Sequence, residues 1–385
     1  MVYLDNSATT RPRKEVVDAV ADYSYENFGN PSSLHRMGLN AEKDMKKFRK
    51  GIADIIKADP SEIYFTAGGT ESNNIAVHGI VSRFKNRKAH IICSAIEHPS
   101  ILNIFKHYGF TDNIDVDYLE VDSDGIVNLE KLEELIRDDT ALVSIMLVNN
   151  ETGTIQPAEE ISRIIRKKNS ETVFHSDCVQ AFGKIDIDVK KLDIDMISVS
   201  SHKIYAPKGS GALYIRKGLT VNPPFQGGGQ ERDIRPGTEN TPGIFGFAKA
   251  AEIMEERKDE ERKRMKEIKE YALGRIEKEI EDVKINSPMG DKHIDNILNI
   301  SISGIKAEIL LHTLEEKEIY LSTGSACSSK SKDKSHVLKA IGLSEKEIDG
   351  SVRISFSHSD TKEEIDYFID ELKEAVEDIR SILAL

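Results

Sequence analysis

The sequence contains few cysteines, and their spacing is not that of a structural site. Its 385 residues include only Cys93, Cys178 and Cys327, an odd number without close metal-ligand spacing. A disulfide framework or a zinc site is therefore not expected, and the three thiols are expected to be reduced. One of them could be reactive.

Long apolar runs and an excess of basic residues are also missing. No stretch approaches the length of a membrane span, and the opening MVYLDNSATT has no basic start followed by an apolar run. We therefore expect a cytoplasmic protein without a membrane partner. Lys and Arg number 53 against 66 Asp and Glu, giving a net charge of −13, which disfavours direct binding of nucleic acid.

What the sequence does contain is the pattern of an α/β protein. Between about residues 60 and 215, β-rich runs alternate with helical stretches, which predicts a mostly parallel central sheet. These runs are EIYFTA, AHIICSA, VDYLEV, ALVSIMLV, TVFHSD, DMISVSS and GALYIR. Several end in small or polar residues. Ligand crevices in such sheets lie at the carboxyl ends of the strands, so we expect these tails to converge.

A second, smaller domain is expected after the α/β region. Beyond about Gly243, strong helix formers with interleaved charges predict a long connecting helix. Two strand-like runs, NILNISI and SVRISFS, and a final amphipathic helix then predict a small α+β domain. We assign residues 16–245 to the large domain, and residues 1–15 with 246–385 to the small one. The Ser-, Lys- and Gly-rich stretch 322–335 is expected to form a mobile surface loop.

Lys203 is the strongest local candidate for chemistry. An apolar strand delivers Ser200, Ser201, His202 and Lys203 in succession to a Pro- and Gly-rich loop. A lysine at the end of a buried strand loses part of its hydration, which suits Schiff-base chemistry, although most lysines are simply solvated. Ser200 and His202 are well placed to donate to a phosphate.

Two other strand ends carry candidate cofactor contacts. Gly68, Gly69 and Thr70 stand between a strand and a helix, where the backbone can approach a phosphate, although Gly-Gly before a helix is more often a turn. Asp177 follows an apolar strand, where it could pair with a protonated pyridine nitrogen or cap the next helix. Gln180 could hydrogen-bond a ring oxygen or face solvent.

Three further residues have both a functional and a structural interpretation. Cys327 lies among small residues and upstream of three lysines, which exposes the thiol and favours its thiolate, but it could be an incidental surface thiol. Arg353 could bind a substrate carboxylate with its fork or form a structural ion pair. His98 could stack on a flat ring or be an ordinary hydrogen-bonded histidine. Cys93, inside an apolar run, is expected to be an inert core residue.

Together, these segments resemble the cysteine desulfurases of the NifS and IscS type, in the class V aminotransferase group of pyridoxal-phosphate (PLP) enzymes. The matching segments are FGNPSSLH, TAGGTESNN, EHPS, NNETGTIQP, HSDCVQ, SSHKIYAPKGSGALY, GGGQERDIRPGTEN and STGSACSS. They follow the family order from YLDNSATT at residue 3 to SVRISFS near residue 357. The resemblance implies fold type I of the PLP-dependent transferases, as in aspartate aminotransferase.

The resemblance also implies a role for each candidate in cofactor binding. Lys203 would bind PLP covalently, Asp177 would pair with its pyridinium nitrogen, and His98 would stack on the ring and could supply a proton. The remaining contacts would be Gln180 and Asn150 at the polar edge of the ring, and Gly69, Thr70, Ser200 and His202 at the phosphate. Thr238 would reach the phosphate bound by a neighbouring subunit, which implies a homodimer.

The implied reaction converts L-cysteine to L-alanine. Arg353 matches the arginine that binds the substrate carboxylate, with Asn150 nearby, and Cys327 matches the cysteine that takes the sulfur as a persulfide. The acceptor would be a protein such as an iron–sulfur scaffold or a tRNA-thiolation enzyme. A selenocysteine lyase, another class V aminotransferase or a scaffold without catalysis remain alternatives. The sequence leaves open the role of Cys178, which replaces the usual small residue, and whether Cys327 is also a transient iron–sulfur ligand.

Overall fold

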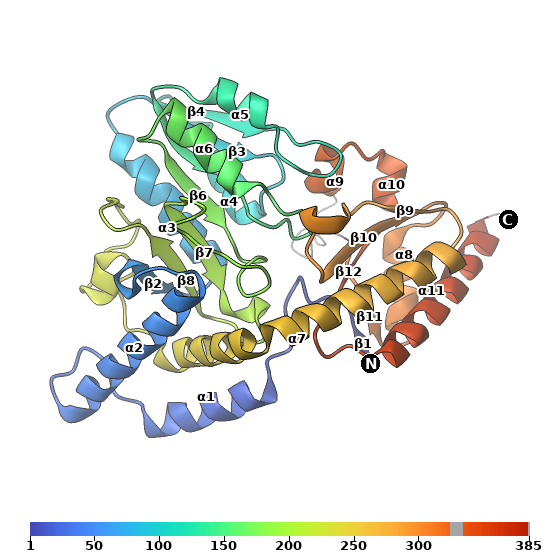
Figure 1. The fold of residues 1–385 in the computed structure, drawn as a ribbon, viewed down its shortest axis with the longest axis horizontal. Coiled ribbons are helices and arrows are strands. Elements are labelled where there is room, and N and C mark those ends of the chain that lie inside the picture. The colour runs from blue at the N-terminus through green and yellow to red at the C-terminus, as the bar shows by residue number, and fades with distance from the viewer. Residues whose placement is uncertain (324–333, 384–385) are drawn as a thin grey trace.

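The computed structural model describes residues 1–323 and 334–383, and it is centred on one large sheet (Figure 1). Seven strands follow the order β2-β8-β7-β6-β5-β3-β4. They are β2 (Ile63–Thr66), β3 (Ala89–Ser94), β4 (Ile114–Leu119), β5 (Thr140–Ser144), β6 (Val173–Asp177), β7 (Met196–Ser200) and β8 (Gly211–Ile215). Within this sheet only β8 runs antiparallel to its neighbours. The predicted strands and the mostly parallel sheet are confirmed.

Helices cover both faces of this sheet, which explains why β3, β5, β6, β7 and β8 are buried along their whole length. Ile92 and Val143 belong to the hydrophobic cluster of one face, and their neighbours Ile91 and Leu142 belong to the cluster of the other. The first face packs against α5 (Leu129–Leu135) and α6 (Ala158–Lys168), and the second against α3 (Gly69–Val81) and α4 (Pro99–Tyr108).

One 39-residue helix, α7 (Thr241–Glu279), connects the large sheet to the rest of the chain (Figure 1). Phe247 and Met254 of α7 pack into the core of the large sheet, together with α1 (Lys14–Glu26) and α2 (Arg36–Ile55). Ile268 and Ile276 of the same helix pack into a separate core. The predicted connecting helix is confirmed. Because α7 continues through residues 245 and 246, the assigned domain boundary stays a prediction.

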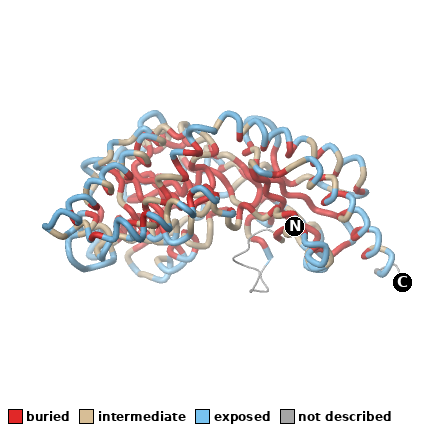
Figure 2. The backbone as a smooth tube through the Cα atoms, turned by 90° about the horizontal axis from the view of Figure 1, so that it is seen from below, coloured by how far each residue is buried: buried red, intermediate tan, exposed pale blue. Residues whose placement is uncertain are grey.

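The separate core belongs to a smaller α+β part. Its antiparallel sheet has the order β12-β10-β9, and β1 pairs with β11 in a parallel ribbon. These strands are β1 (Val2–Tyr3), β9 (Val283–Ile285), β10 (Ile297–Ile302), β11 (Ile319–Tyr320) and β12 (Ser351–Ser355). The helices are α8 (Ala307–Glu315), α9 (His336–Ala340), α10 (Glu345–Asp349) and α11 (Lys362–Leu383). Figure 2 shows buried backbone inside both parts and exposed backbone along the outer helices.

Short 3₁₀ turns complete the described structure. They span Pro60–Glu62, Ser82–Phe84, Ser201–Lys203, Gln230–Asp233 and Gly290–Lys292. Across residues 1–323 and 334–383, no helix has both the length and the apolar character needed to cross a membrane.

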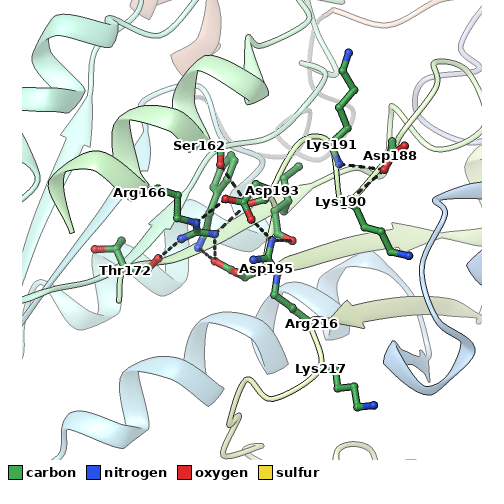
Figure 3. A network of polar contacts seen from close by, with 12 residues as sticks. Ser162, Arg166, Thr172, Asp188, Lys190, Lys191, Asp193, Asp195, Arg216 and Lys217 are labelled. Atoms are coloured by element: carbon green, nitrogen blue, oxygen red, sulfur yellow. Dashed lines mark hydrogen bonds and ion pairs between the residues drawn. The ribbon is translucent and has the colours of Figure 1, made fainter. Parts of the chain in front are cut away.

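An ionic network stabilises the amino ends of β6 and β7 (Figure 3). Nε of Arg166 lies 2.9 Å from Asp193 Oδ2, and its Nη2 lies 2.7 Å from Asp195 Oδ2. Arg216, after β8, binds the same two aspartates. Asp195 directly precedes β7, and Thr172, whose carbonyl Arg166 also binds, directly precedes β6. The network therefore fixes the edge of the sheet opposite the carboxyl ends of these strands.

Candidate active site

A cavity lies at the carboxyl ends of the strands, where the sequence predicts a crevice. Strand tails, the segment after β1 and strand β12 all contribute to its wall. Its lining residues are Ser7, Ala8, Gly69, Thr70, His98, Ser100, Met146, Asn150, Asp177, Val179, Gln180, Ser200, His202, Lys203 and Arg353. Ten of the residues selected from the sequence are among them. Thr238 is exposed and does not line the cavity, and Cys327 lies outside the described residues.

The amino-terminal segment holds the Lys203 side chain. Nζ of Lys203 donates to the carbonyl oxygens of Ser7 and Ala8, at 2.7 Å for Ala8. The Ser7 carbonyl also accepts from Nε2 of Gln180 at 2.9 Å. Thr10 Oγ1 donates to the carbonyl of His202, which joins the segment to the Lys203 turn. Sequence reasoning missed Ser7 and Ala8. The segment YLDNSATT, which contains both, contributed to the family resemblance but suggested no chemical role for either residue.

Asp177 presents a buried carboxylate at the end of β6. It is 4% exposed, and it accepts hydrogen bonds from Nδ2 of Asn73 at 2.7 Å and from the backbone of Val179 at 2.9 Å. Within the described ranges no cation forms an ion pair with it. A buried anion of this kind needs a positive partner, and a protonated pyridine nitrogen supplies one. Asn73, another residue that sequence reasoning missed, fixes the orientation of this carboxylate.

The amino terminus of α3 forms a cradle that suits a phosphate. Helix α3 begins at Gly69, and its first amide groups have no acceptor within the helix. A Cβ at Gly69 would lie 2.6 Å from Cγ2 of Val179, so the close approach at this turn requires glycine. Ser200 and His202 add polar groups from the end of β7. Burial, reinforced by the charge of Lys203, lowers the pKa of His202 to about 3, so its ring is neutral.

His98 combines a helix-capping role with a position in the cavity wall. Its Nδ1 accepts from the backbone N–H of Ser100 at 3.1 Å, which caps α4. The neutral ring therefore carries its proton on Nε2. Burial lowers the pKa of His98, Asp177 opposes this shift, and Lys203 and His336 reinforce it.

Arg353 forms the structural ion pair that was one of the two alternatives suggested by its sequence context; binding of a substrate carboxylate stays a prediction. It lines the cavity, and its Nη2 forms an ion pair with Asp5 Oδ1 at 2.8 Å. Its Nη1 donates to the carbonyl of Asn150 at 2.9 Å. Its Nε is buried and has no hydrogen-bond partner among residues 1–323 and 334–383. The guanidinium is therefore held in place with donor capacity left for an anion.

Segments on both sides of residues 324–333 attach beside this cavity. Before the gap, Ser322 pairs through its backbone with Arg353. After it, Oγ of Ser335 donates to the buried carboxylate of Glu151 at 2.5 Å, and Nε2 of His336 lies 2.9 Å from the carbonyl oxygen of Glu97. The residues that flank this segment therefore contact the cavity residue Arg353 and the sequence neighbours of Asn150 and His98.

The two described cysteines are unsuited to nucleophilic chemistry. Cys93 in β3 and Cys178 after β6 are both fully buried. Burial raises the pKa of each thiol well above its ordinary value, so neither forms a thiolate near neutral pH.

Known proteins match nearly the whole chain. A family model described as aminotransferase class-V matches residues 2–368. A cysteine desulfurase IscS from Methanosarcina thermophila is 44% identical over 387 residues, covering 100% of this chain and 94% of that protein. The solved structure of a NifS-like protein has a TM-score of 0.92 at 40% identity, covering 98% of this chain and 99% of that one. A structure of SspA in complex with cysteine has a TM-score of 0.81 at 35% identity, covering 94% of this chain and 100% of that one.

Proposed function

Since this chain belongs to the class-V aminotransferase family and is a PLP-dependent cysteine desulfurase, we propose that Lys203 and Cys327 divide its reaction between them. One observation carries the proposal for Lys203. Its amine, the buried carboxylate of Asp177 and the phosphate cradle at Gly69 line the same cavity. That combination matches the reactive, cationic and anionic groups of PLP.

The cavity residues bind and orient the cofactor. Lys203 Nζ would bond to it, Asp177 would hold its pyridine nitrogen, and His98 would lie against its ring. The phosphate contacts come from Gly69, Thr70, Ser200 and His202, and the contacts to the polar edge of the ring from Gln180 and Asn150. When bound, PLP supplies an electron sink for negative charge that develops at the substrate Cα.

Proton transfer is assigned to two groups of the chain. Lys203 Nζ, oriented by the carbonyls of Ser7 and Ala8, takes the proton from the substrate Cα. Nε2 of His98 carries a proton on the cavity side of α4, since its Nδ1 is occupied by Ser100. His98 is therefore the second proton donor.

Substrate orientation is assigned to Arg353. Its guanidinium binds the carboxylate of L-cysteine, because the fork of an arginine matches the two oxygens of a carboxylate. The carbonyl of Asn150 and the carboxylate of Asp5 hold this fork against the cavity wall.

The sulfur transfer itself is assigned to Cys327, which lies outside the described residues. Its thiolate forms a bond to the substrate sulfur while the carbon–sulfur bond breaks. The electrons of the broken bond remain on the substrate carbon, which takes a proton, and L-alanine and a persulfide on Cys327 result.

Mass spectrometry after incubation with L-cysteine tests this division. Added sulfur is expected on Cys327 and not on Cys93 or Cys178, and Cys327→Ala is expected to lose alanine production. Lys203→Ala is expected to lose both the visible absorbance of the cofactor and all turnover. Lys208→Ala, an exposed lysine five residues along the chain, should retain both. Full alanine production by Cys327→Ala in the presence of a thiol reductant would contradict the role of Cys327.

The functional unit is proposed to be a homodimer. Several large apolar side chains between residues 17 and 39 are exposed, including Tyr25 at 80%, Phe28 at 72% and Leu34 at 94%. Clustered exposure of this kind marks an interaction surface. Thr238, exposed in this chain, would then reach the phosphate held by the partner subunit.

The sulfur is proposed to pass to an acceptor protein, such as an iron–sulfur scaffold or a tRNA-thiolation enzyme. A cytoplasmic location stays a prediction.

A further inference from the structure

Lys184 is a buried ammonium group behind the cavity, and sequence reasoning did not select it. It is 8% exposed, and its Nζ donates to Oε1 of Gln180 at 3.0 Å. Over residues 1–323 and 334–383, no carboxylate lies within ion-pair distance of this nitrogen. A buried cation without a carboxylate partner is costly, so its contact with Gln180 calls for a functional explanation.

The contact determines how the Gln180 amide is oriented. An ammonium can only donate and a carbonyl can only accept, so Oε1 of Gln180 must face Lys184 and Nε2 must face the carbonyl of Ser7. The Ser7 carbonyl also accepts from Nζ of Lys203. A continuous chain of hydrogen bonds therefore connects Lys184 through Gln180 and Ser7 to Lys203.

The other charged groups around Lys184 do not neutralise it. Lys184 and Lys203 line a second, much smaller cavity, whose other charged residues are Lys258, Glu261 and Arg262 of α7. The Glu261 carboxylate is already paired with both oxygens to Arg13, at 2.8 and 2.7 Å. Burial, reinforced by the charges of Lys203 and Arg353, lowers the pKa of Lys184 to about 7. Its charge is therefore present below neutral pH and is lost above it.

We propose that Lys184 is a positioning residue for the desulfurase reaction. Its ammonium fixes the Gln180 amide so that Nε2 is presented on the side of Lys203 and the cofactor. The same charge repels a positive charge on Nζ of Lys203, which favours the uncharged amine that bonds to PLP. The inference rests on the proposed assignment of Lys203 and Gln180 to cofactor binding.

The test compares PLP affinity of the full-length apoprotein at pH 6 and pH 9. Lys184→Met keeps the length of the side chain but removes the donor and the charge, whereas Lys184→Arg keeps both. Lys191→Met is the matched control, because the Lys191 side chain is 69% exposed and lines neither cavity. Thermal unfolding of each apoprotein reports on folding.

Lys184→Met is expected to bind PLP about tenfold more weakly than wild type at pH 6 and to differ by less than about threefold at pH 9, because Lys184 is uncharged there. The PLP affinity of Lys184→Arg at pH 6 should be less than about threefold below that of wild type. The PLP affinity of Lys191→Met should match that of wild type at both pH values. A purely structural role would weaken binding equally at both pH values. That result, or an unchanged affinity, overturns the inference.

Two further measurements keep the result decisive. If Lys184→Met does not fold, Lys184→Gln replaces it, since the glutamine amide can still donate but carries no charge. Lys184→Gln should then bind PLP more weakly than wild type at pH 6 and about as tightly at pH 9, and an affinity equal to wild type at both pH values contradicts the proposal. Failure of Lys203→Ala to change PLP absorbance would contradict the assignment of Lys203 itself, which is a separate outcome.

Discussion

Nη2 of Arg353 donates to Oδ1 of Asp5 at 2.8 Å, joining two residues that are 348 positions apart in the chain. The Arg353 side chain is 2% exposed and that of Asp5 is 19% exposed. Asp5 therefore balances the charge of a guanidinium that lines the substrate cavity. In the proposed site, a substrate carboxylate at Arg353 would share this guanidinium with Asp5.

Asp5→Asn should strengthen substrate binding and weaken the fold. Removing the competing anion leaves Arg353 more positive, so the KM for L-cysteine should fall about threefold. Loss of the charged hydrogen bond should lower the free energy of unfolding by about 2 kcal/mol. Steady-state kinetics and urea titration measure the two effects. Asp186→Asn, a control at an exposed aspartate, should change neither, and an unchanged KM in Asp5→Asn would show that the two anions do not compete.

Gly69→Ala should reduce PLP affinity by at least about tenfold, because the added Cβ would lie 2.6 Å from Cγ2 of Val179 and displace the phosphate cradle. Gly51→Ala is the control. Gly51 lies inside α2 with open space around its Cα, and alanine there should stabilise the protein by up to about 1 kcal/mol. Fluorescence titration of each apoprotein with PLP gives the affinities. Equal affinities for the two variants would contradict the role of Gly69.

His175 should make stability depend on pH in the acid range. It is fully buried between Ser144 and Ser198, and burial lowers its pKa to about 3. The unfolded chain binds a proton at His175 near pH 6.5, and the folded chain does not. The contribution of His175 to the free energy of unfolding is therefore complete above pH 6.5 and is lost as the pH falls toward 3. His175→Gln removes this proton linkage.

The difference in unfolding free energy between wild type and His175→Gln should therefore shrink by about 2 kcal/mol between pH 7.5 and pH 5. His202 and His293, whose pKa values are also lowered to about 3, remain in both proteins, as do Glu97 and Asp360, whose pKa values are raised. Their contributions cancel in the comparison. A difference that stays constant in urea titrations at the two pH values would mean that His175 takes up a proton in the folded state.

Phe28→Asp combined with Leu34→Asp should convert the proposed dimer to a monomer. Both side chains are highly exposed in the single chain, and charge at a buried interface is costly. Analytical ultracentrifugation gives the oligomeric state. Phe110→Asp, at an 88% exposed phenylalanine outside residues 17–39, should leave it unchanged. If Thr238 serves the partner's phosphate, PLP affinity should fall together with dimerisation.

The sequence by itself predicted the large sheet and most of the cavity wall. The strands around Ile92 and Val143 are rich in apolar residues because helices cover both faces of the sheet, and that pattern is visible locally. The carboxyl ends of such strands share one edge of the sheet. The sequence alone therefore placed Asp177, Ser200 and Lys203 in one crevice, and all three line the cavity. The strands β1, β9 and β11 were not predicted, because two or three residues carry no period.

Only the tertiary structure decided which distant residues complete the site. Asp5, Ser7 and Ala8 reach it because β1 pairs with β11 and the following segment crosses to the Lys203 turn. No local feature of the sequence distinguishes Lys184 from an ordinary lysine after a glycine. Its burial follows from the packing of α7 over it. The hydrophobic period and the residues at strand ends depend on neighbours in the chain, whereas these contacts depend on how two separate cores are held together by α7. That is why Lys203 and Asp177 could be selected from the sequence, while the partners that orient Lys203 and Arg353 required the fold.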